Sequence, residues 1–453
     1  MILADTIVAV ATPHGFGGIS VIRISGPDSK NIAKKISLTN KNKTRFRHQS
    51  VTLVKIINSD GLPFEEGVIT FFKNPHSYTG EDVIEISCHG NPSIINKVLS
   101  LCCSSGARIA DPGEFTKRAF LNGKIDLIQA EAVASLINSK TEMGASLNFK
   151  MLHGELSKKI KKIRKELKNL LIRVEFELDI SEEDLQPELV PDSLSALKKI
   201  QTTIKGALDT HNSVRMLNDG ASVVICGSPN AGKSTLLNCL SGFDRAITGP
   251  EAGTTRDTVR ASISIGGTHV TLVDTAGLRV SKNKIEKEGV SRAKKEINSS
   301  DCALVLTPGD GPIKNKHLKV SDGPTVHVIT KADLCSSSEI SRFKNRFPDA
   351  CVISAKTAFG IPALLKTIQE HMGFFASLSP LVPVATGRQN SILKKTNYCI
   401  QKSISLLSFG DAVPFELVSF ELQDALEQVD LVLGKTSTDE ILDGVFSSFC
   451  VGK

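Results

Sequence analysis

The run GSPNAGKST at residues 227–235 has the residue types and the spacing of a loop that binds phosphate groups. It follows the apolar run SVVIC and precedes LLNCLSG, so a strand should enter the loop and a helix should leave it. Gly227 and Gly232 allow backbone N–H groups to turn toward a phosphate, to which the helix N-terminus adds its positive end. Lys233 is expected to reach the β- and γ-phosphates, and the Ser234 hydroxyl to bind Mg²⁺. The residues expected to line this part of the site are Asn230, Ala231, Gly232, Lys233, Ser234 and Thr235.

Two segments downstream carry groups that suit the metal ion and the γ-phosphate. The run GTTRD, at 253–257, offers the Thr255 hydroxyl as a second Mg²⁺ ligand. The run DTAGL, at 274–278, ends a stretch typical of a strand and supplies Asp274 behind the metal and Gly277 to the γ-phosphate. The nucleotide contacts expected from these segments are Thr254, Thr255, Asp274, Thr275, Ala276 and Gly277.

Two later segments predict that the base is guanine. In TKAD, at 330–333, the Asp333 carboxylate can accept hydrogen bonds from two N–H groups of guanine, a pair that adenine lacks. In SAK, at 354–356, a backbone N–H can donate to the guanine oxygen. Guanine sites usually have asparagine where this chain has Thr330, so the preference rests mainly on Asp333. The residues expected around the base are Thr330, Lys331, Asp333, Ser354, Ala355 and Lys356.

The residue that would position the attacking water is not in its usual place. Ras-like enzymes have a glutamine directly after DTAG, and this chain has Leu278, which cannot orient water. Glu286 and Glu288 follow in the next segment, and either carboxylate could do so, while a surface role for each stays open. The sequence has no obvious arginine finger, but the amide oxygen of Asn230 could hold a monovalent cation in the same position.

Composition indicates a chain of about three domains with real hydrophobic cores. It has 453 residues, of which 40% are hydrophobic, and a net charge of +7 that permits contact with nucleic acid without demanding it. The ten cysteines form no CxxC pair, which favours a reducing compartment and argues against zinc. No signal peptide and no apolar run of membrane-spanning length is apparent, so we expect a cytosolic protein without a membrane span.

The elements that must position these motifs change along the chain. Residues 1–120 mix short β-type runs with Gly-rich turns and predict a compact α/β domain. Residues 121–215 and 378–453 have helical periodicity, whereas in 216–377 buried-type strands alternate with helices, as in a doubly wound parallel sheet. We therefore expect a multidomain α/β plus all-α fold, in which a Ras-like P-loop G domain is inserted into a discontinuous helical domain.

One long helix is predicted from the apolar residues between 152 and 178. These recur at steps of three or four, at Leu152, Leu156, Ile160, Ile163, Leu167, Leu171, Val174 and Leu178. The opposite face carries Lys158, Lys159, Lys161, Lys162, Arg164, Lys165 and Lys168. A solvated face is the simpler interpretation of these charges, and an RNA-contacting face is the alternative.

These motifs, together with both ends of the chain, resemble the MnmE (TrmE) family of tRNA-modification GTPases. The likeness covers nearly the whole length and includes SYTGEDVIEISCHG and DPGEFTKRAFLNGKIDLIQAEAVASLI near the N-terminus. It also includes AGTTRD, DTAGLR and IEKEGVSRA in the centre and FSSFCVGK at the end. The RAFLNGKIDL run and the terminal run are much more specific than the phosphate loop, which many unrelated proteins share.

The resemblance implies roles for several residues of the G domain. Glu286, rather than Glu288, matches the glutamate that orients the water. Potassium would be held by Asn230, Gly249, Glu251 and Thr254. In the family, a potassium-dependent contact between two G domains completes the active site, and Gly249 joins the residues around GTP.

The same resemblance implies a reduced-folate site on the N-terminal domain, for 5,10-methylenetetrahydrofolate or a related carrier. Arg23, Glu85, Lys124 and the terminal Lys453 match the residues that contact folate. Cys450 would then lie near one-carbon chemistry, where a thiol can act as a nucleophile or an acid/base, while a merely buried side chain is the alternative. A tail held in such a pocket explains why a thiol stands three residues before the end.

The reaction implied by the family adds an aminomethyl or carboxymethylaminomethyl group to C5 of the wobble uridine in certain tRNAs. Implied partners are a second copy of the chain, joined through the N-terminal domains, and the flavin-dependent MnmG (GidA), in a heterotetramer or larger complex. A ribosome-assembly or regulatory GTPase would explain the nucleotide motifs equally well, but it leaves the first 120 residues and the tail unused. A nucleotide-dependent scaffold with negligible turnover is a third possibility, suggested by Leu278.

Overall fold

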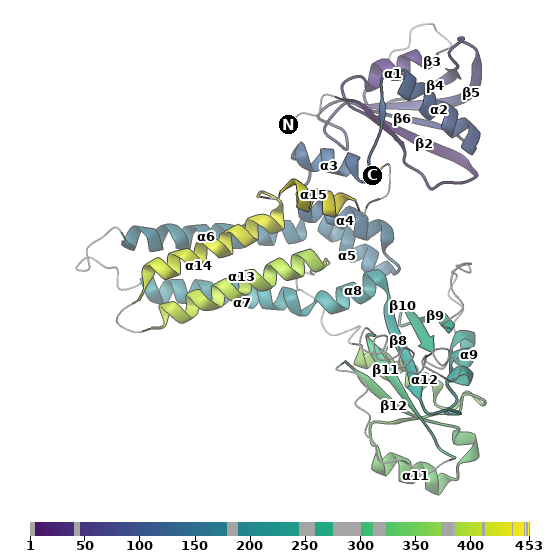
Figure 1. The fold of residues 1–453 in the computed structure, drawn as a ribbon, viewed down its shortest axis with the longest axis vertical. Coiled ribbons are helices and arrows are strands. Elements are labelled where there is room, and N and C mark those ends of the chain that lie inside the picture. Colours follow the sequence, from purple (N-terminus) through teal and green to yellow (C-terminus); the bar gives the residue numbers. More distant parts are fainter. Residues whose placement is uncertain are drawn as a thin grey trace, which may run out of the picture. The chain divides into compact units, whose positions relative to one another are not determined.

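The computed structural model describes most of the chain as two compact units (Figure 1). The described residues are 5–39, 46–178, 189–243, 259–274, 300–310, 323–372, 384, 386–409, 413–436, 438–447, 449 and 452. The terminal unit consists of Met1–Ala134, Met151–Gln201 and Ile392–Lys453, and the central unit of Ser135–Lys150 and Thr202–Ser391.

The terminal unit contains a mixed sheet of seven strands in the order β3-β4-β5-β6-β2-β1-β7. The strands are β1 (Ile7–Val10), β2 (Gly17–Ser25), β3 (Ser37–Leu38), β4 (Val51–Ile57), β5 (Pro63–Phe72), β6 (Val83–Gly90) and β7 (Arg108–Ile109). Neighbours are antiparallel except for β1 and β7, which are parallel. This pairing places β6 in the middle of the sheet between β5 and β2, and the fully buried β1 between β2 and the short edge strand β7.

Helices cover both faces of this sheet because β1 alternates its side chains between two cores. Val8 and Val10 pack with α1 (Ser29–Lys35) and α2 (Pro92–Ser104) in one apolar cluster. Ile7 and Ala9 point the other way and pack with Phe115 of α3 (Glu114–Leu121). The strand therefore connects the main core to the helix that carries the RAFLNGK run.

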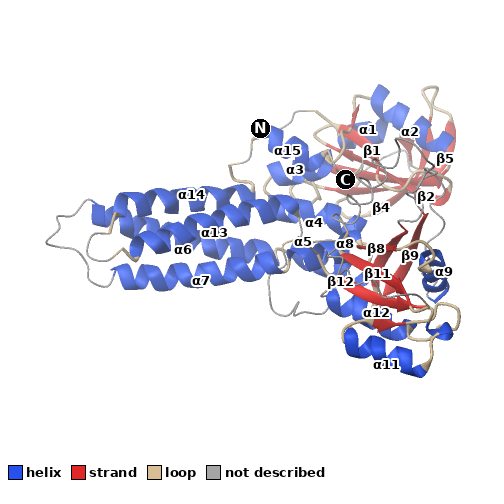
Figure 2. Cartoon of the chain, turned by 60° about the horizontal axis from the view of Figure 1, so that its bottom comes forward, coloured by secondary structure: helices blue, strands red, loops and turns tan. Residues whose placement is uncertain are grey.

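A bundle of long helices forms much of the rest of the terminal unit: α6 (Glu155–Leu178), α7 (Leu189–Asp209), α13 (Gly387–Leu407) and α14 (Phe415–Leu433), which Figure 2 shows side by side. The shorter helices α4 (Leu127–Asn138) and α15 (Asp439–Phe446) also belong mainly to this unit, whereas most of α5 (Glu142–Leu152) belongs to the central unit. Ion pairs link neighbours: Arg164 of α6 binds Asp430 of α14 at 2.8 Å, and Lys402 of α13 binds Glu421 of α14 at 2.8 Å. The helical segments before and after the central strands thus pack together.

The single helix predicted from residue 152 to 178 is wrong at its start. Leu152 ends α5, and α6 begins at Glu155, because Gly154 adopts φ +82°, a conformation that breaks a helix and favours glycine. Leu152 packs beside Leu127 in a separate apolar cluster, whereas Leu156 begins the buried stripe of the bundle. The stripe also ends early, since Leu178 is exposed.

The central unit contains a six-stranded sheet in the order β13-β12-β11-β8-β10-β9. Its strands are β8 (Ala221–Gly227), β9 (Val259–Ile265), β10 (Thr268–Asp274), β11 (Cys302–Pro308), β12 (Thr325–Thr330) and β13 (Cys351–Val352). All neighbours are parallel except β9 and β10. The carboxyl ends of β8, β10 and β12 therefore lie along the same edge of the sheet.

Helices pack on both faces of this sheet, which makes it doubly wound. On one face, α9 (Lys233–Phe243) and α12 (Ile361–His371) share an apolar core with β8 and β11. On the other, Phe343 of α11 (Ser337–Arg346) packs against Ile329 of β12. Also in this unit are α8 (His211–Asp219) and the short 3₁₀ helix η3 (Ala332–Leu334).

The fold class expected from the sequence, multidomain α/β plus all-α, is confirmed. The boundaries at residues 120, 215 and 377 stay predictions. Among the described helices, none is both long enough and apolar enough to cross a membrane.

Candidate functional sites

The phosphate loop connects β8 to α9 and has the backbone shape that its glycines predict. Gly227 has φ +155°, and a Cβ there would lie 2.6 Å from the Leu306 carbonyl oxygen, so no side chain fits. Gly232 and Asn230 also have positive φ, of +85° and +61°, and asparagine tolerates that region better than most residues. The Lys233 ammonium donates to the carbonyls of Gly227 and Ser228, at 3.2 and 3.0 Å, across the loop. It is thereby placed where a phosphate chain would be held.

Two expected metal-site residues meet at the edge of the sheet. The Ser234 hydroxyl, at the start of α9, donates to Oδ2 of Asp274 at 3.0 Å. Asp274 ends β10 and is buried. A hydroxyl and a carboxylate are hard oxygen groups of the kind that Mg²⁺ prefers, so this pair fits the expected ion.

The base-recognition segments lie along the same edge. At the end of β12 the buried Thr330 hydroxyl donates to the Ala231 carbonyl in the phosphate loop, at 2.8 Å. The Ser354 hydroxyl donates to Oδ1 of Asp333 at 2.7 Å, and this bond is the main cause that lowers the pKa of Asp333. Asp333 is therefore ionised at neutral pH and can only accept hydrogen bonds.

The remaining base-site predictions are near these two segments. Lys331 has φ +61°, and its ammonium binds Asp310 at 2.8 Å. Ala355 and Lys356 follow Ser354 directly in the chain. The described part of the chain thus brings TKAD, SAK and the phosphate loop to one edge of one sheet.

Several expected site residues lie outside the described residues. They are Gly249, Glu251, Thr254, Thr255, Thr275, Ala276, Gly277, Glu286, Cys450 and Lys453. Their roles stay predictions.

Arg23 is the centre of a second cluster, in the terminal unit. It lies on β2 directly opposite Glu85 on β6, and its Nε donates to Oε1 of Glu85 at 2.9 Å. Its Nη1 donates to the carbonyl of Gly452 at 3.3 Å. The guanidinium carbon also lies 5.5 Å from the centre of the Tyr78 ring and 5.7 Å from that of Phe115. One side chain thus joins two central strands, helix α3 and the end of the chain.

The C-terminal segment reaches this cluster by close backbone packing. The Phe446 and Phe449 rings contact each other at a tilt of 48°, with ring centres 5.4 Å apart, inside an apolar cluster. A Cβ at Gly113 would lie 2.6 Å from the Phe446 carbonyl oxygen, and one at Gly452 would collide with the carbonyl of Val10. Both glycines have positive φ, so the end of the chain can approach β1 only with glycine at these positions.

Lys124, the third expected folate residue, lies beside the same loop as Tyr78. Its ammonium donates to the Pro75 carbonyl at 2.9 Å, and a Cβ at Gly80 would lie 3.3 Å from its Cγ. The loop from 75 to 80 therefore connects Lys124 with the ring that lies over Arg23.

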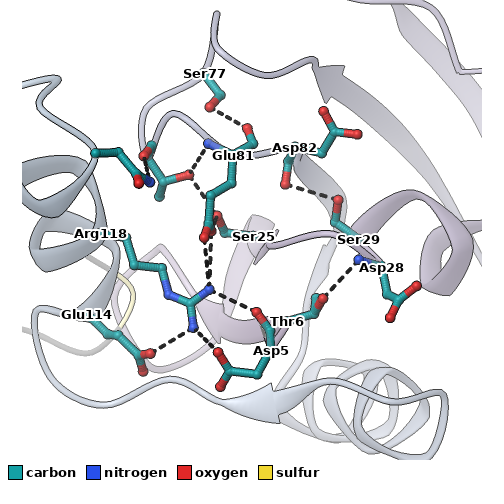
Figure 3. Close-up of polar contacts among 12 residues, drawn as sticks. Asp5, Thr6, Ser25, Asp28, Ser29, Ser77, Glu81, Asp82, Glu114 and Arg118 are labelled. Carbon is teal, nitrogen blue, oxygen red and sulfur yellow. Dashed lines mark hydrogen bonds and ion pairs between the residues drawn. The ribbon is translucent and has the colours of Figure 1, made fainter. Parts of the chain in front are cut away.

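Sequence reasoning missed a buried charge network next to this cluster, drawn in Figure 3. Arg118 on α3 has a side chain only 1% exposed. Its Nη2 donates to Asp5 at 2.8 Å and to Glu114 at 3.0 Å, and its Nη1 donates to both oxygens of Glu81 at 3.2 Å. The signal in the sequence was weak: an arginine within the RAFLNGK run, with Glu114 one helical turn earlier and the other two partners far away along the chain.

The network fixes the elements that carry the two aromatic rings on Arg23. Glu81 accepts a bond from Ser25 at 2.7 Å and follows the loop that holds Tyr78. The Tyr78 hydroxyl is 2.9 Å from the Thr116 hydroxyl on α3, the helix that also carries Phe115. Arg118 therefore positions the second cluster without touching Arg23.

The arginines also control the ionisation of their carboxylate partners. Burial alone would raise the pKa values of Asp5 and Glu114, but the hydrogen bonds and charges of Arg108 and Arg118 outweigh it, so both pKa values are lowered. A lowered pKa in the folded state stabilises the fold above the unfolded pKa, and that stability is lost as the pH falls through the folded value.

We therefore predict a pH-dependent stability defect for Arg118→Met. At neutral pH it leaves buried carboxylates short of a cation and should lower the free energy of unfolding by about 3–5 kcal/mol. As the pH falls from neutral toward about 4, the carboxylates of the variant take up protons first, so the difference from wild type should shrink. Urea denaturation of both proteins at a series of pH values measures this difference in the free energy of unfolding.

The matched control is Lys117→Met, one residue earlier on α3, where the ammonium makes a half-exposed pair with Asp443. It should cost less than about 1 kcal/mol. A difference between Arg118→Met and wild type that does not change with pH would contradict the assignment.

Comparison with known proteins identifies the family of the chain. The family model described as GTP-binding protein TrmE N-terminus matches residues 6–124, and that of the MnmE helical domain matches residues 127–450. A tRNA modification GTPase MnmE from Aquifex aeolicus (strain VF5) is 36% identical, with 100% of both chains covered. One from Thermosipho melanesiensis is 38% identical over 99% of this chain and 100% of its own, and one from Acinetobacter baumannii (strain AYE) is 38% identical over 99% and 98%.

Solved structures are similar over a smaller part. The G domain of the T. maritima FeoB iron transporter is 18% identical, covering 33% of this chain and 98% of its own, with a TM-score of 0.25. Assignment therefore rests on the sequence relatives, which span the whole chain at 34–38% identity. The chain belongs to the MnmE family of tRNA modification GTPases.

Proposed function

We propose that this protein is a potassium-activated GTPase that uses a reduced-folate one-carbon unit in tRNA modification. With a flavin-dependent MnmG partner, it would install the aminomethyl or carboxymethylaminomethyl group at C5 of the wobble uridine. The observation that carries the proposal is that one chain combines a guanine-nucleotide edge with a C-terminal tail bound to Arg23. A plain GTPase switch needs the first feature and has no use for the second.

GTP binding and cleavage would use the edge of the central sheet. Asp333 accepts hydrogen bonds from the base, and Lys233 and the loop N–H groups hold the phosphates. Ser234 and Thr255 would hold Mg²⁺, with Asp274 behind the metal, and the ion would neutralise charge on the β- and γ-phosphates. Glu286 would orient the attacking water, because Leu278 cannot.

Potassium would take the place of an arginine finger. Asn230 lies in the phosphate loop with its backbone in the left-handed region, which turns this residue out of the helical path. Asn230, Gly249, Glu251 and Thr254 would supply oxygen ligands, and the ion would offset the charge that develops on the transferred phosphate.

Reduced folate would bind near Arg23. Glu85 suits the guanine-like edge of the pterin ring, while Arg23, Lys124 and Lys453 suit the carboxylates of the glutamate tail. Support comes from two residues on either side of Cys450: Phe449 packs in an apolar cluster with α4 and α15, and Gly452 lies against Val10 of β1. Cys450 would then act beside the one-carbon unit as a nucleophile or an acid/base.

The proposed assembly is a cytosolic homodimer, joined through the N-terminal domains, that binds MnmG in a heterotetramer or larger complex with tRNA. The proposed domains are 1–120, 121–215, 216–377 and 378–453, with the G domain as the insert. Family membership supports both proposals.

GTP turnover should depend on potassium and on Glu286. We expect the purified chain to hydrolyse GTP at least about tenfold faster in potassium than in sodium, because only the larger ion fits the proposed oxygen ligands. Glu286→Ala should abolish turnover with nearly unchanged GDP affinity, and Glu288→Ala is the matched control that should keep it. Equal, near-zero rates in both salts would eliminate the cation mechanism, and loss of turnover in Glu288→Ala alone would reassign the water-orienting residue.

Wobble uridines should lack the C5 modification in cells without this protein. Mass spectrometry of digested tRNA measures the amount of modified uridine. Returning the wild-type gene to these cells should restore the modified nucleoside, whereas a gene that carries Glu286→Ala should not. Unchanged modification in the deleted cells would leave a GTPase without the tRNA function, as in ribosome-assembly or regulatory GTPases.

A further inference from the structure

Thr330 occupies the position at which guanine sites usually have asparagine, and its hydroxyl already makes a hydrogen bond within the protein. The side chain is 3% exposed at the end of β12, and Oγ1 lies 2.8 Å from the carbonyl oxygen of Ala231. A carbonyl oxygen can only accept, so the hydroxyl of Thr330 must donate. The bond ties the strand that precedes Asp333 to the loop that holds the phosphates.

A hydroxyl has a single hydrogen, and Thr330 donates it to the carbonyl oxygen of Ala231. Only lone pairs of Oγ1 remain for a bound base. On the corresponding edge of guanine, N7 and O6 are both acceptors. Two acceptors cannot form a hydrogen bond, so Thr330 cannot make a hydrogen bond to N7. An asparagine amide has two N–H donors and a carbonyl, and it could therefore bond to both the base and the loop.

The opposite edge of guanine, with N1–H and the N2 amino group, has a suitable acceptor in Asp333. The Asp333 carboxylate accepts the Ser354 hydroxyl on Oδ1 at 2.7 Å and a bond from its own backbone N–H, and lone pairs remain on the carboxylate to accept from the base. Guanine presents N1–H and the N2 amino group as donors on that side. The carboxylate and these two donors are complementary, and adenine cannot reproduce them.

We propose that this chain recognises guanine through Asp333 alone among its side chains and leaves N7 without a hydrogen bond. Thr330 is then a positioning residue that acts on the nucleotide through Ala231. The inference rests on the proposed GTP function and specifies how that site reads the base.

The test compares GDP with 7-deaza-GDP, in which N7 is replaced by a C–H group, on the full-length chain by titration calorimetry. Wild type should bind both with affinities equal to within about twofold. Thr330→Asn supplies a free N–H donor, so it should bind GDP on the order of three- to tenfold more tightly than 7-deaza-GDP, as expected for one added hydrogen bond.

Two further variants distinguish support of the phosphate loop through Ala231 from direct contact with the base. Thr330→Val keeps the shape of the side chain but leaves the Ala231 carbonyl without the Thr330 donor. The affinities for GDP and 7-deaza-GDP should therefore fall together, and the ratio of the two affinities should stay near one. Thr330→Ser restores the hydroxyl and should restore both affinities.

Opposite results identify which claim fails. A penalty of about threefold or more for 7-deaza-GDP in wild type would show that N7 is contacted and would overturn this inference alone. Failure of wild type to bind GDP at all would instead overturn the proposed function on which the inference rests.

Discussion

The guanidinium of Arg23 is the charge around which the terminal unit is arranged. An arginine keeps its proton, so a side chain only 15% exposed must find partners for its donors. Those partners come from β6 through Glu85, from the end of the chain through the Gly452 carbonyl, and from two aromatic faces. Gly452 is thus held against the first two strands, where a terminal segment would otherwise fray.

A second buried arginine keeps that arrangement rigid. Arg118 holds together the N-terminal strand, the loop after Tyr78 and helix α3, all of which contribute to the surroundings of Arg23. In the central unit a neutral bond has the same function, since Thr330 ties the base-recognition strand to the phosphate loop. In each case one side chain joins segments that lie far apart in the sequence.

The sequence predicted the central sheet well because its signals are local. The runs ASVVICG and TVHVIT coincide with β8 and β12, since buried parallel strands are continuous apolar stretches, and the phosphate loop has fixed spacing. The break at Gly154 was missed because a lone glycine in a helical pattern is ambiguous until its φ is known. The Arg118 network was missed because Asp5 and Glu81 lie far from Arg118 along the chain and meet it only in the folded domain, although Glu114 is one turn away on the same helix. Glu286 and Cys450 lie outside the described residues, so their roles rest on the family resemblance.

The most direct test of the central claim is the affinity for a reduced folate of a chain that lacks residues 450–453. This truncation keeps Phe449 and the packing of α15, and it removes the Gly452 carbonyl that Arg23 binds. Calorimetry with 5-formyltetrahydrofolate should show affinity lowered by about tenfold or more relative to the full chain, with GDP affinity unchanged. Undiminished folate binding by the shortened chain would contradict the account, because the two ends of the polypeptide would then not build a common site.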